Sequence, residues 1–466
     1  MKNLILKALF FVILCSSSIA NSQTRLAPIF GDNMVMQQST SATVWGWDNA
    51  NQKVRVSTSW NKKDYSTTAN KEGKWIVKVH TPNAGGPFSI TIKGSKTIVL
   101  NDVLIGEVWL CSGQSNMEMP VKGYRNQPVL NSQEAILNSA NNNIREFAVK
   151  RTFSRAPQSE CEGEWKISNP ENTGDFSATA YFFGRKLNSI LNIPIGLIHS
   201  SWGGTDVLAW TDSVTIASYK ELDLSKYAGR KQNYPAALYN GMINPLVPYT
   251  INGVIWYQGE RNRAESELYD YAFPGMINNW RELFQKQDLS FYYVQIAPYR
   301  YDGTNQGAYL RESQLKTMLE VPFTGMAVTM DIGDYNYIHP ADKETVGTRL
   351  AYWALARTYG IKGIAYSGPV YKNLEVINNE AHVYFDYAED GLSSYGRRIN
   401  YFQIAGDDKV FYPAEARISG QGRVIVTSEE VSKPVAVRYG WFDFAKGNLF
   451  NNAGLPASSF RTDNWK

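Results

Sequence analysis

The pattern of apolar and polar positions changes twice along the chain. Residues 25–102 and 361–466 contain short runs in which apolar and polar side chains alternate with a period of two, separated by turn residues. Such alternation is typical of antiparallel strands that bury one face. Over residues 103–360, short apolar runs alternate instead with stretches of helical spacing. We therefore predict a central α/β domain with a largely parallel sheet, flanked by two antiparallel β modules.

The central region is expected to contain five strands and four helices. Phe183, Leu187 and Leu191, for example, recur at the spacing of one helix face within the stretch 178–191. In an open parallel sheet, ligands bind beyond the carboxyl ends of the strands, so the loops that follow the strands matter most. The strands are predicted at 103–111, 193–198, 253–257, 291–296 and 326–330, and the helices at 178–191, 268–284, 307–319 and 342–359.

Four of these loops carry residues that acyl transfer needs. The first loop places Ser115 at the tip of a small polar turn, and the last contains His339 just ahead of Pro340. A serine hydroxyl becomes a nucleophile when a base removes its proton and donors stabilise the oxyanion. The glycine pair 203–204 and Gln258 are candidate donors. The alternatives are a capped turn around the serine and a capping or surface role for the histidine.

The N-terminus has the features of an export signal. Residues 1–20 combine Lys2 and Lys7 with an apolar core at 8–14 and a small-x-small pattern at Ser18-Ile19-Ala20. This arrangement is typical of a cleaved signal peptide, and the apolar core is too short for a membrane span. We expect an exported protein, periplasmic or extracellular and soluble, with no membrane span. Cys15 lacks the small preceding residue of a lipoprotein signal, so a lipoprotein is the minor alternative.

Charge and metal-binding residue types narrow the function. The formal net charge of +4 is too small and too dispersed to favour a nucleic-acid partner. The four histidines have no metal-ligand spacing, so neither a metal site nor another cofactor is predicted. Cys111 and Cys161 remain after signal cleavage, and either a disulfide or two buried thiols would fit the sequence.

Several sequence blocks, in order, resemble the SGNH-hydrolase superfamily and, within it, the bacterial sialate O-acetylesterase family. The resemblance covers nearly the whole mature chain. It implies a three-layer α/β/α catalytic domain, Ser115 as nucleophile and His339 as general base. It also implies an oxyanion hole from the Ser115 backbone, Gly204 of the glycine pair and Gln258. The matching blocks are 26–37, 44–47, 106–118, 256–260 and 338–340.

The chain departs from that family at the third catalytic position. Many relatives have an aspartate two or three residues before the histidine, where this chain has Asn336 and Tyr337. Either a Ser-His dyad suffices, or an acid comes from elsewhere, and the candidates are Asp331, Asp334 and Glu260. Losing the orienting acid lowers the rate by orders of magnitude without abolishing catalysis.

A second departure follows Gln258-Gly259-Glu260. Relatives commonly have Ser-Asn there, whereas this chain has Arg261 and Arg263. These arginines would suit the carboxylate of an acidic sugar. Solvated charges, or a salt bridge to Glu265 or Glu267, are an equally good interpretation. We expect a serine esterase that removes O-acetyl groups from sialic acid without a cofactor. The alternatives are an esterase for acetylated xylan or another glycan, and a weakly catalytic glycan-binding protein.

Overall fold

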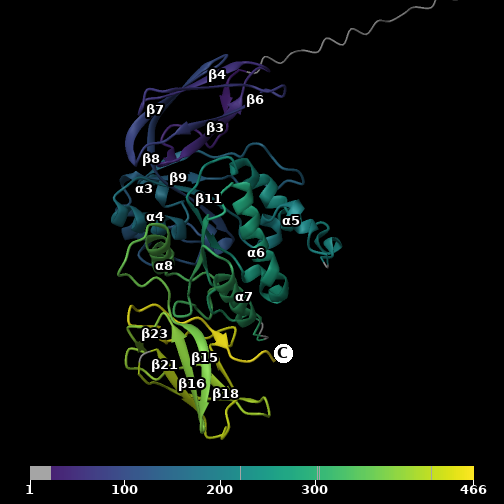
Figure 1. Cartoon of the computed structure of the whole chain (residues 1–466), viewed down its shortest axis with the longest axis vertical. Coiled ribbons are helices and arrows are strands. Elements are labelled where there is room, and N and C mark those ends of the chain that lie inside the picture. The colour runs from purple at the N-terminus through teal and green to yellow at the C-terminus, as the bar shows by residue number, and fades with distance from the viewer. Residues whose placement is uncertain (1–22, 221, 302, 304, 421, 466) are drawn as a thin grey trace, which may run out of the picture.

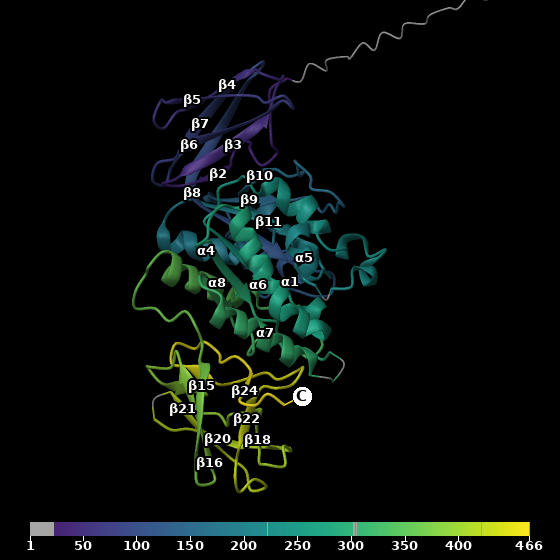
Figure 2. The same cartoon turned by 45° about the vertical axis from the view of Figure 1, so that its right-hand side comes forward.

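The protein consists of three tiers stacked along its long axis. The structure is a computed structural model that describes residues 23–465 apart from 221, 302, 304 and 421. A β module at the N-terminus is followed by a mixed α/β tier and then by a second β module, and two views agree on this order (Figures 1 and 2). The predicted signal peptide at 1–20 lies outside the described residues.

The N-terminal module is built around a strand that it shares with the central tier. The first part of β8, up to Ile105, pairs with β7 in the module. Residues 107–113 of the same strand pair with β11 in the central sheet. The strand that leads to Ser115 is therefore anchored in two tiers. The strands of this module are β1 (Arg25–Leu26), β2 (Val35–Gln37), β3 (Ser41–Trp47), β4 (Lys53–Thr58), β5 (Asp64–Thr68), β6 (Lys74–His80), β7 (Gly85–Lys93) and β8 (Thr97–Gly113).

The central sheet has the order β10-β9-β11-β8-β12-β13-β14. All neighbouring pairs in it are parallel except β10 with β9. β8 thus lies in the middle, between β11 and β12, and its carboxyl end faces the edge where ligands bind in such sheets. The remaining strands are β9 (Asn141–Ala148), β10 (Trp165–Ser168), β11 (Ile195–Ser201), β12 (Gly253–Tyr257), β13 (Ser290–Val294) and β14 (Thr324–Ala327).

Helices cover both faces of this sheet and make three layers. Alternate residues of β8 point to opposite faces: Trp109 and Cys111 join the core beneath α4 and α8, whereas Val108 and Leu110 join the core beneath α6 and α7. This is the period of two expected for a strand buried on both sides. The helices are α1 (Ser115–Glu118), α2 (Ser132–Leu137), α3 (Pro170–Thr173), α4 (Ala178–Leu191), α5 (Ser213–Ala217), α6 (Ser266–Leu283), α7 (Gln306–Glu320) and α8 (Lys343–Trp353).

The C-terminal module forms its own core from antiparallel strands, with Val383, Ile404 and Val437 buried between them. Arg311 of α7 reaches toward this module and donates to the carbonyls of Gly440 and Phe442. Buried contacts therefore join the module to the central tier. Its strands are β15 (Val370–Ile377), β16 (Glu380–Asp386), β17 (Leu392–Ser393), β18 (Phe402–Ala405), β19 (Phe411–Pro413), β20 (Glu415–Ile418), β21 (Arg423–Thr427), β22 (Ala436–Tyr439), β23 (Phe450–Asn451) and β24 (Phe460–Arg461).

Two strands of the central sheet, β9 and β10, were not predicted from the sequence. β9 carries charged residues that are nonetheless buried, because Arg145 pairs with Asp102 at 2.9 Å and Glu146 accepts from the Thr173 hydroxyl at 2.9 Å. Burial raises the pKa of Glu146 to about 7. Paired side chains thus enter a sheet interior that a hydropathy pattern would assign to apolar residues.

The helix predicted over 342–359 is interrupted. α8 ends at Trp353, and a π-helical turn at Ala354–Thr358 completes the segment. Cys111 and Cys161 are both buried and unpaired, so the thiol alternative holds. Across the described residues, no helix combines the length and apolar character that a membrane crossing requires.

Candidate active site

The turn that carries Ser115 requires glycine at its start. Gly113 has φ +138°, and a Cβ there would lie 2.2 Å from the Tyr257 carbonyl oxygen on β12. The Gln114 N–H donates to the same carbonyl at 2.9 Å. The strand is therefore held against β12 up to its last residue, and the chain then turns into α1. Ser115 is the first residue of that helix, half-buried at the carboxyl edge of the sheet.

Two contacts tie this turn to the loop that carries His339. The Asn116 side chain donates to the carbonyl of Ile338 at 3.1 Å. The Tyr124 hydroxyl donates to the Ser115 carbonyl at 3.2 Å, and the Tyr124 ring lies edge-on to the imidazole with 5.4 Å between the ring centroids. The structure therefore brings together the two loops that contain the predicted nucleophile and base.

The two ring nitrogens of His339 have different surroundings. Its Nδ1 lies 2.6 Å from Gln127 Oε1, and its Nε2 is buried without a hydrogen-bond partner among the described residues. Burial, followed by the positive charge of Lys343, lowers the pKa of His339 to about 4. At neutral pH the ring is therefore uncharged, and an Nδ1–H bonded to Gln127 leaves the Nε2 lone pair free to accept a proton.

Of the candidate oxyanion donors, Gly203 lies nearest to the serine. A Cβ on Gly203 would be 3.2 Å from the Ser115 Cβ, whereas one on Gly204 would meet nothing within 4 Å. The Gly203 N–H donates to Glu118 Oε2 at 2.7 Å, so a carboxylate occupies this donor. Glu118 in turn accepts from Arg151 at 2.9 Å. The N–H of the glycine whose Cβ would approach Ser115 is therefore already engaged with a side-chain carboxyl group.

Gln258 is fully buried, and its amide nitrogen is engaged. Nε2 donates to the Thr205 carbonyl at 3.0 Å and to Asn262 Oδ1 at 2.7 Å. The oxygen of the same amide has no partner within the described chain. A Gln258 donor for an oxyanion would therefore have to give up one of these two bonds.

Two of the three candidate acids are engaged away from the imidazole. Asp331 forms a two-pronged ion pair with Arg349 of α8, both contacts measuring 2.7 Å. Asp334 accepts from the backbone N–H groups of Asn336 and Tyr337 and thereby caps its own turn. The partner of His339 Nδ1 is the side-chain amide of Gln127, not a carboxylate.

The third candidate acid, Glu260, belongs to a buried polar chain behind the serine turn. Asn116 donates to Glu260 and accepts from the Lys343 ammonium group. Burial raises the pKa of Glu260 and lowers that of Lys343 to about 7, and the attraction between the two charges opposes both shifts. These two contacts fix the orientation of the Asn116 side chain.

The two arginines after Glu260 differ in their surroundings. Arg261 is exposed, and its backbone N–H donates to Gln114 Oε1 at 3.3 Å. Arg263 is partly buried, donates to the Glu260 carbonyl at 3.3 Å and lies over the Tyr301 ring with 5.0 Å to the centroid. Arg261 therefore has the freer guanidinium for a substrate, and Arg263 supports the turn.

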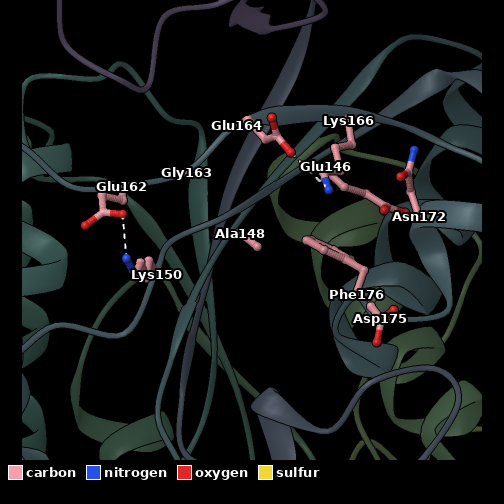
Figure 3. A pocket seen from close by; sticks show the side chains of 10 residues that line it. All are labelled: Glu146, Ala148, Lys150, Glu162, Gly163, Glu164, Lys166, Asn172, Asp175 and Phe176. Atoms are coloured by element: carbon pink, nitrogen blue, oxygen red, sulfur yellow. Dashed lines mark hydrogen bonds and ion pairs between the residues drawn. The ribbon is translucent and has the colours of Figure 1, made fainter.

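A separate pocket of about 440 Å³ lies near the β9–β10 edge of the sheet (Figure 3). Lys150 and Glu162 pair across one side of it, and the Phe176 ring projects from the other. Neither Ser115 nor His339 lines this pocket. Across the described residues, no group of three or more His, Cys, Asp or Glu side chains is placed to hold a metal ion.

Sequence reasoning did not find Gln127, Tyr124 or Lys343. Gln127 and Tyr124 lie in a polar loop without periodicity, and Lys343 reads as an ordinary residue of a helix first turn. The sequence shows only that Lys343 follows His339 by four residues. The burial of Lys343, which is rare for a lysine without a partner, is visible only in the structure.

Comparisons with known proteins agree on one family. A family model described as a carbohydrate esterase, sialic acid-specific acetylesterase, matches residues 105–356, more than half of the 466 residues. A carbohydrate acetylesterase from Xanthomonas citri superposes with a TM-score of 0.87 and 37% sequence identity, over 95% of this chain and 100% of that chain. The sialate O-acetylesterase of Homo sapiens is 29% identical over 98% of this chain and 96% of its own length. The sialate O-acetylesterase of Rattus norvegicus is 30% identical over 76% of this chain and 77% of its own length.

Proposed function

Because the chain belongs to the family of sialic acid-specific carbohydrate acetylesterases, and so is a carboxylic ester hydrolase, we propose that it removes O-acetyl groups from sialic acid through Ser115 and His339. The observation that carries this proposal is the state of His339. Its Nε2 is buried and unpartnered within the described chain, its pKa is lowered to about 4, and its loop is bonded to the Ser115 turn. These are the properties of a base ready to take a proton at neutral pH.

In the first half of the reaction, Ser115 Oγ attacks the acetyl carbonyl while His339 Nε2 takes the hydroxyl proton. The carbonyl oxygen becomes an oxyanion, for which the N–H groups of Ser115 and of the glycine pair 203–204 are the proposed donors. Glu118 must release the Gly203 N–H for this donor to act. Collapse of the intermediate expels the sugar alkoxide, which receives the proton from His339, and the acetyl group remains on Ser115.

In the second half, water replaces the sugar. His339 removes a proton from the water, whose oxygen attacks the acetyl-serine carbonyl, and the same donors hold the second oxyanion. Collapse returns the proton to Ser115 Oγ and releases acetate. Both halves use groups of the chain and the substrate alone, so the proposal includes no cofactor.

The nucleophile and the base do not select the sugar, because the loops around a reaction centre vary independently of it. Arg261, exposed beside Gln114, is the proposed partner for the carboxylate that distinguishes sialic acid from neutral sugars. The similar protein from Xanthomonas citri is a carbohydrate acetylesterase, a class that includes enzymes for neutral sugars. Acetylated xylan or another neutral glycan is therefore the second candidate substrate.

The test is acetate release from O-acetylated sialic acid and from acetylated xylan, with Ser115→Ala as the matched control. Release from the sialic acid substrate by the wild type alone supports both the substrate and the nucleophile. Release only from xylan would replace the substrate and keep the mechanism. Equal release by wild type and Ser115→Ala would contradict the proposed nucleophile.

Export of the chain is also proposed, on the basis of residues 1–20. The mature protein would then begin just after Ala20 and act in the periplasm or outside the cell. Mass spectrometry of the protein recovered from the producing cells tests this directly. A mature chain that still begins at Met1 would contradict it.

A further inference from the structure

The loop that follows the serine turn is folded over the histidine. Tyr124 and Gln127 exchange backbone hydrogen bonds of 2.9 and 3.0 Å across a tight turn. Asn126, with φ +61°, occupies the left-handed region that this turn requires. The Leu130 N–H donates to the Ala341 carbonyl at 2.9 Å, two residues beyond His339. The turn is thus fixed at both ends relative to the imidazole.

This turn aims one amide at Nδ1 of the imidazole. Gln127 Oε1 lies 2.6 Å from His339 Nδ1, and Gln127 itself is half-buried. The carboxylates of Asp331 and Asp334 accept hydrogen bonds from Arg349 and from a backbone turn instead. Asn336, at the position where relatives have an aspartate, is exposed.

We propose that Gln127 is the positioning residue of His339, in the place that a carboxylate takes in a Ser-His-Asp triad. This inference rests on the proposed function, in which His339 is the base. The amide oxygen of Gln127 accepts the Nδ1–H of His339. This hydrogen bond selects the tautomer with a lone pair on Nε2 and fixes the plane of the ring. Because the amide is neutral, it does so without attracting a proton to the imidazole.

The absence of charge on Gln127 has a consequence for pH dependence. The charged or titratable groups around the imidazole are Lys343 on α8, Tyr124 in the folded loop and Glu118 on α1, which interacts with Tyr124. Within the described part of the chain, the ring nitrogens of His339 have no hydrogen bond to a carboxylate. The base therefore stays deprotonated in mild acid, where a triad with a carboxylate would begin to lose activity.

The experiment compares Gln127→Leu, Gln127→Glu and the wild type in hydrolysis of a small acetyl ester, from about pH 4 to about pH 8. Gln127→Leu leaves the Nδ1–H without its acceptor and should lower kcat by about 10- to 100-fold, with KM nearly unchanged. Gln127→Glu should recover much of that kcat and move the acid limb of kcat/KM upward by about one to three pH units. Asn126→Gly, in the same turn and compatible with its backbone, is the control and should behave as the wild type.

A purely structural role would give a different pattern. It would lower kcat in both Gln127 variants and leave the acid limb at the wild-type pH. That result, or a Gln127→Leu variant with undiminished kcat, would overturn the proposal.

The tautomer can be read independently of activity. With only four histidines in the chain, ¹⁵N-histidine NMR of the full-length protein can assign His339 by its absence in a His339→Asn variant. We expect the His339 proton on Nδ1 in the wild type and a mixture of the Nδ1–H and Nε2–H tautomers in Gln127→Leu. A proton on Nε2 in the wild type would overturn the proposal. If the wild type hydrolyses no acetyl ester, the proposed function fails, and the NMR result still decides the inference.

Discussion

Replacement of Lys343 by methionine should raise the pH at which the enzyme loses activity in acid. The ammonium group is fully buried, contacts Asn116 and lies 5.2 Å from the centroid of the Tyr257 ring. Its charge is the second cause, after burial, of the lowered pKa of His339. Removing the charge while keeping an apolar chain of similar length relieves that repulsion.

The magnitude follows from the two causes. The pKa of His339 falls from 6.5 to about 4, and burial is the larger contribution. The Lys343 charge therefore accounts for about one unit at most, or ~1.4 kcal/mol of interaction with the imidazolium. We expect the acid limb of kcat/KM, which reports the free enzyme, to move upward by about half a unit to one unit.

The same substitution removes the cation that attracts the buried Glu260 carboxyl group across Asn116. Leaving a buried charge without its counter-charge in this way costs up to about 3–5 kcal/mol of unfolding free energy. A second substitution, Glu260→Gln, removes the stranded charge and should restore much of that loss while keeping the shifted acid limb. The double variant therefore separates the effect on the imidazole from the effect on stability.

The assay is the pH dependence of kcat/KM on a small acetyl ester, with urea unfolding of each variant. Lys372→Met is the control, since Lys372 is an exposed lysine paired with Asp386 in the C-terminal module. An acid limb that stays at the wild-type pH in both Lys343 variants, or moves to lower pH, would contradict the effect of the Lys343 charge on the pKa of His339.

Three further predictions use other contacts. Gly203→Ala adds a Cβ 3.2 Å from that of Ser115. It should lower kcat on the same ester by about 10- to 100-fold with little change in the urea midpoint. An unchanged kcat would contradict a place for Gly203 in the site. Asp331→Asn removes the ion pair with the buried Arg349. It should lower the free energy of unfolding in urea by about 2–4 kcal/mol while kcat stays within a few-fold of the wild type. A large loss of kcat in a stable variant would indicate that Asp331 takes part in the reaction. Burial lowers the pKa of His199 to about 4. Below about pH 6.5 the folded state therefore binds fewer protons than the unfolded chain, and the stability present above that pH falls as the pH approaches 4. His199→Phe should reduce this loss of stability, measured by urea unfolding at about pH 7 and about pH 4.5, and an unchanged loss would contradict the prediction.

Much of the fold could be predicted from periodicity, because most elements bury apolar residues at regular spacing. α4 begins and ends where the spacing of Phe183 and Leu187 predicts. β9 was not predictable in this way, since the burial of Arg145 depends on Asp102, which lies far away in the sequence. Pairings of this kind exist only in the folded chain.

Only some residues of the candidate site could be predicted from the sequence. Ser115 and His339 were singled out because they follow strands and match motifs in order. Gln127 has no such mark, since its contact with His339 joins residues that are far apart in the sequence. The amide of Gln258 looked like a free donor in sequence, and only its contacts with Thr205 and Asn262 reveal that it is engaged.

The central claim is that an acetyl group passes through Ser115 on its way to water. The most direct measurement is mass spectrometry of the enzyme quenched in acid during turnover of O-acetylated sialic acid, with peptide mapping of the modified residue. We expect one acetyl group on Ser115 in the wild type and none in Ser115→Ala, which should also release no acetate. Steady acetate release by Ser115→Ala, or an acetyl group on another residue of an active enzyme, would contradict it.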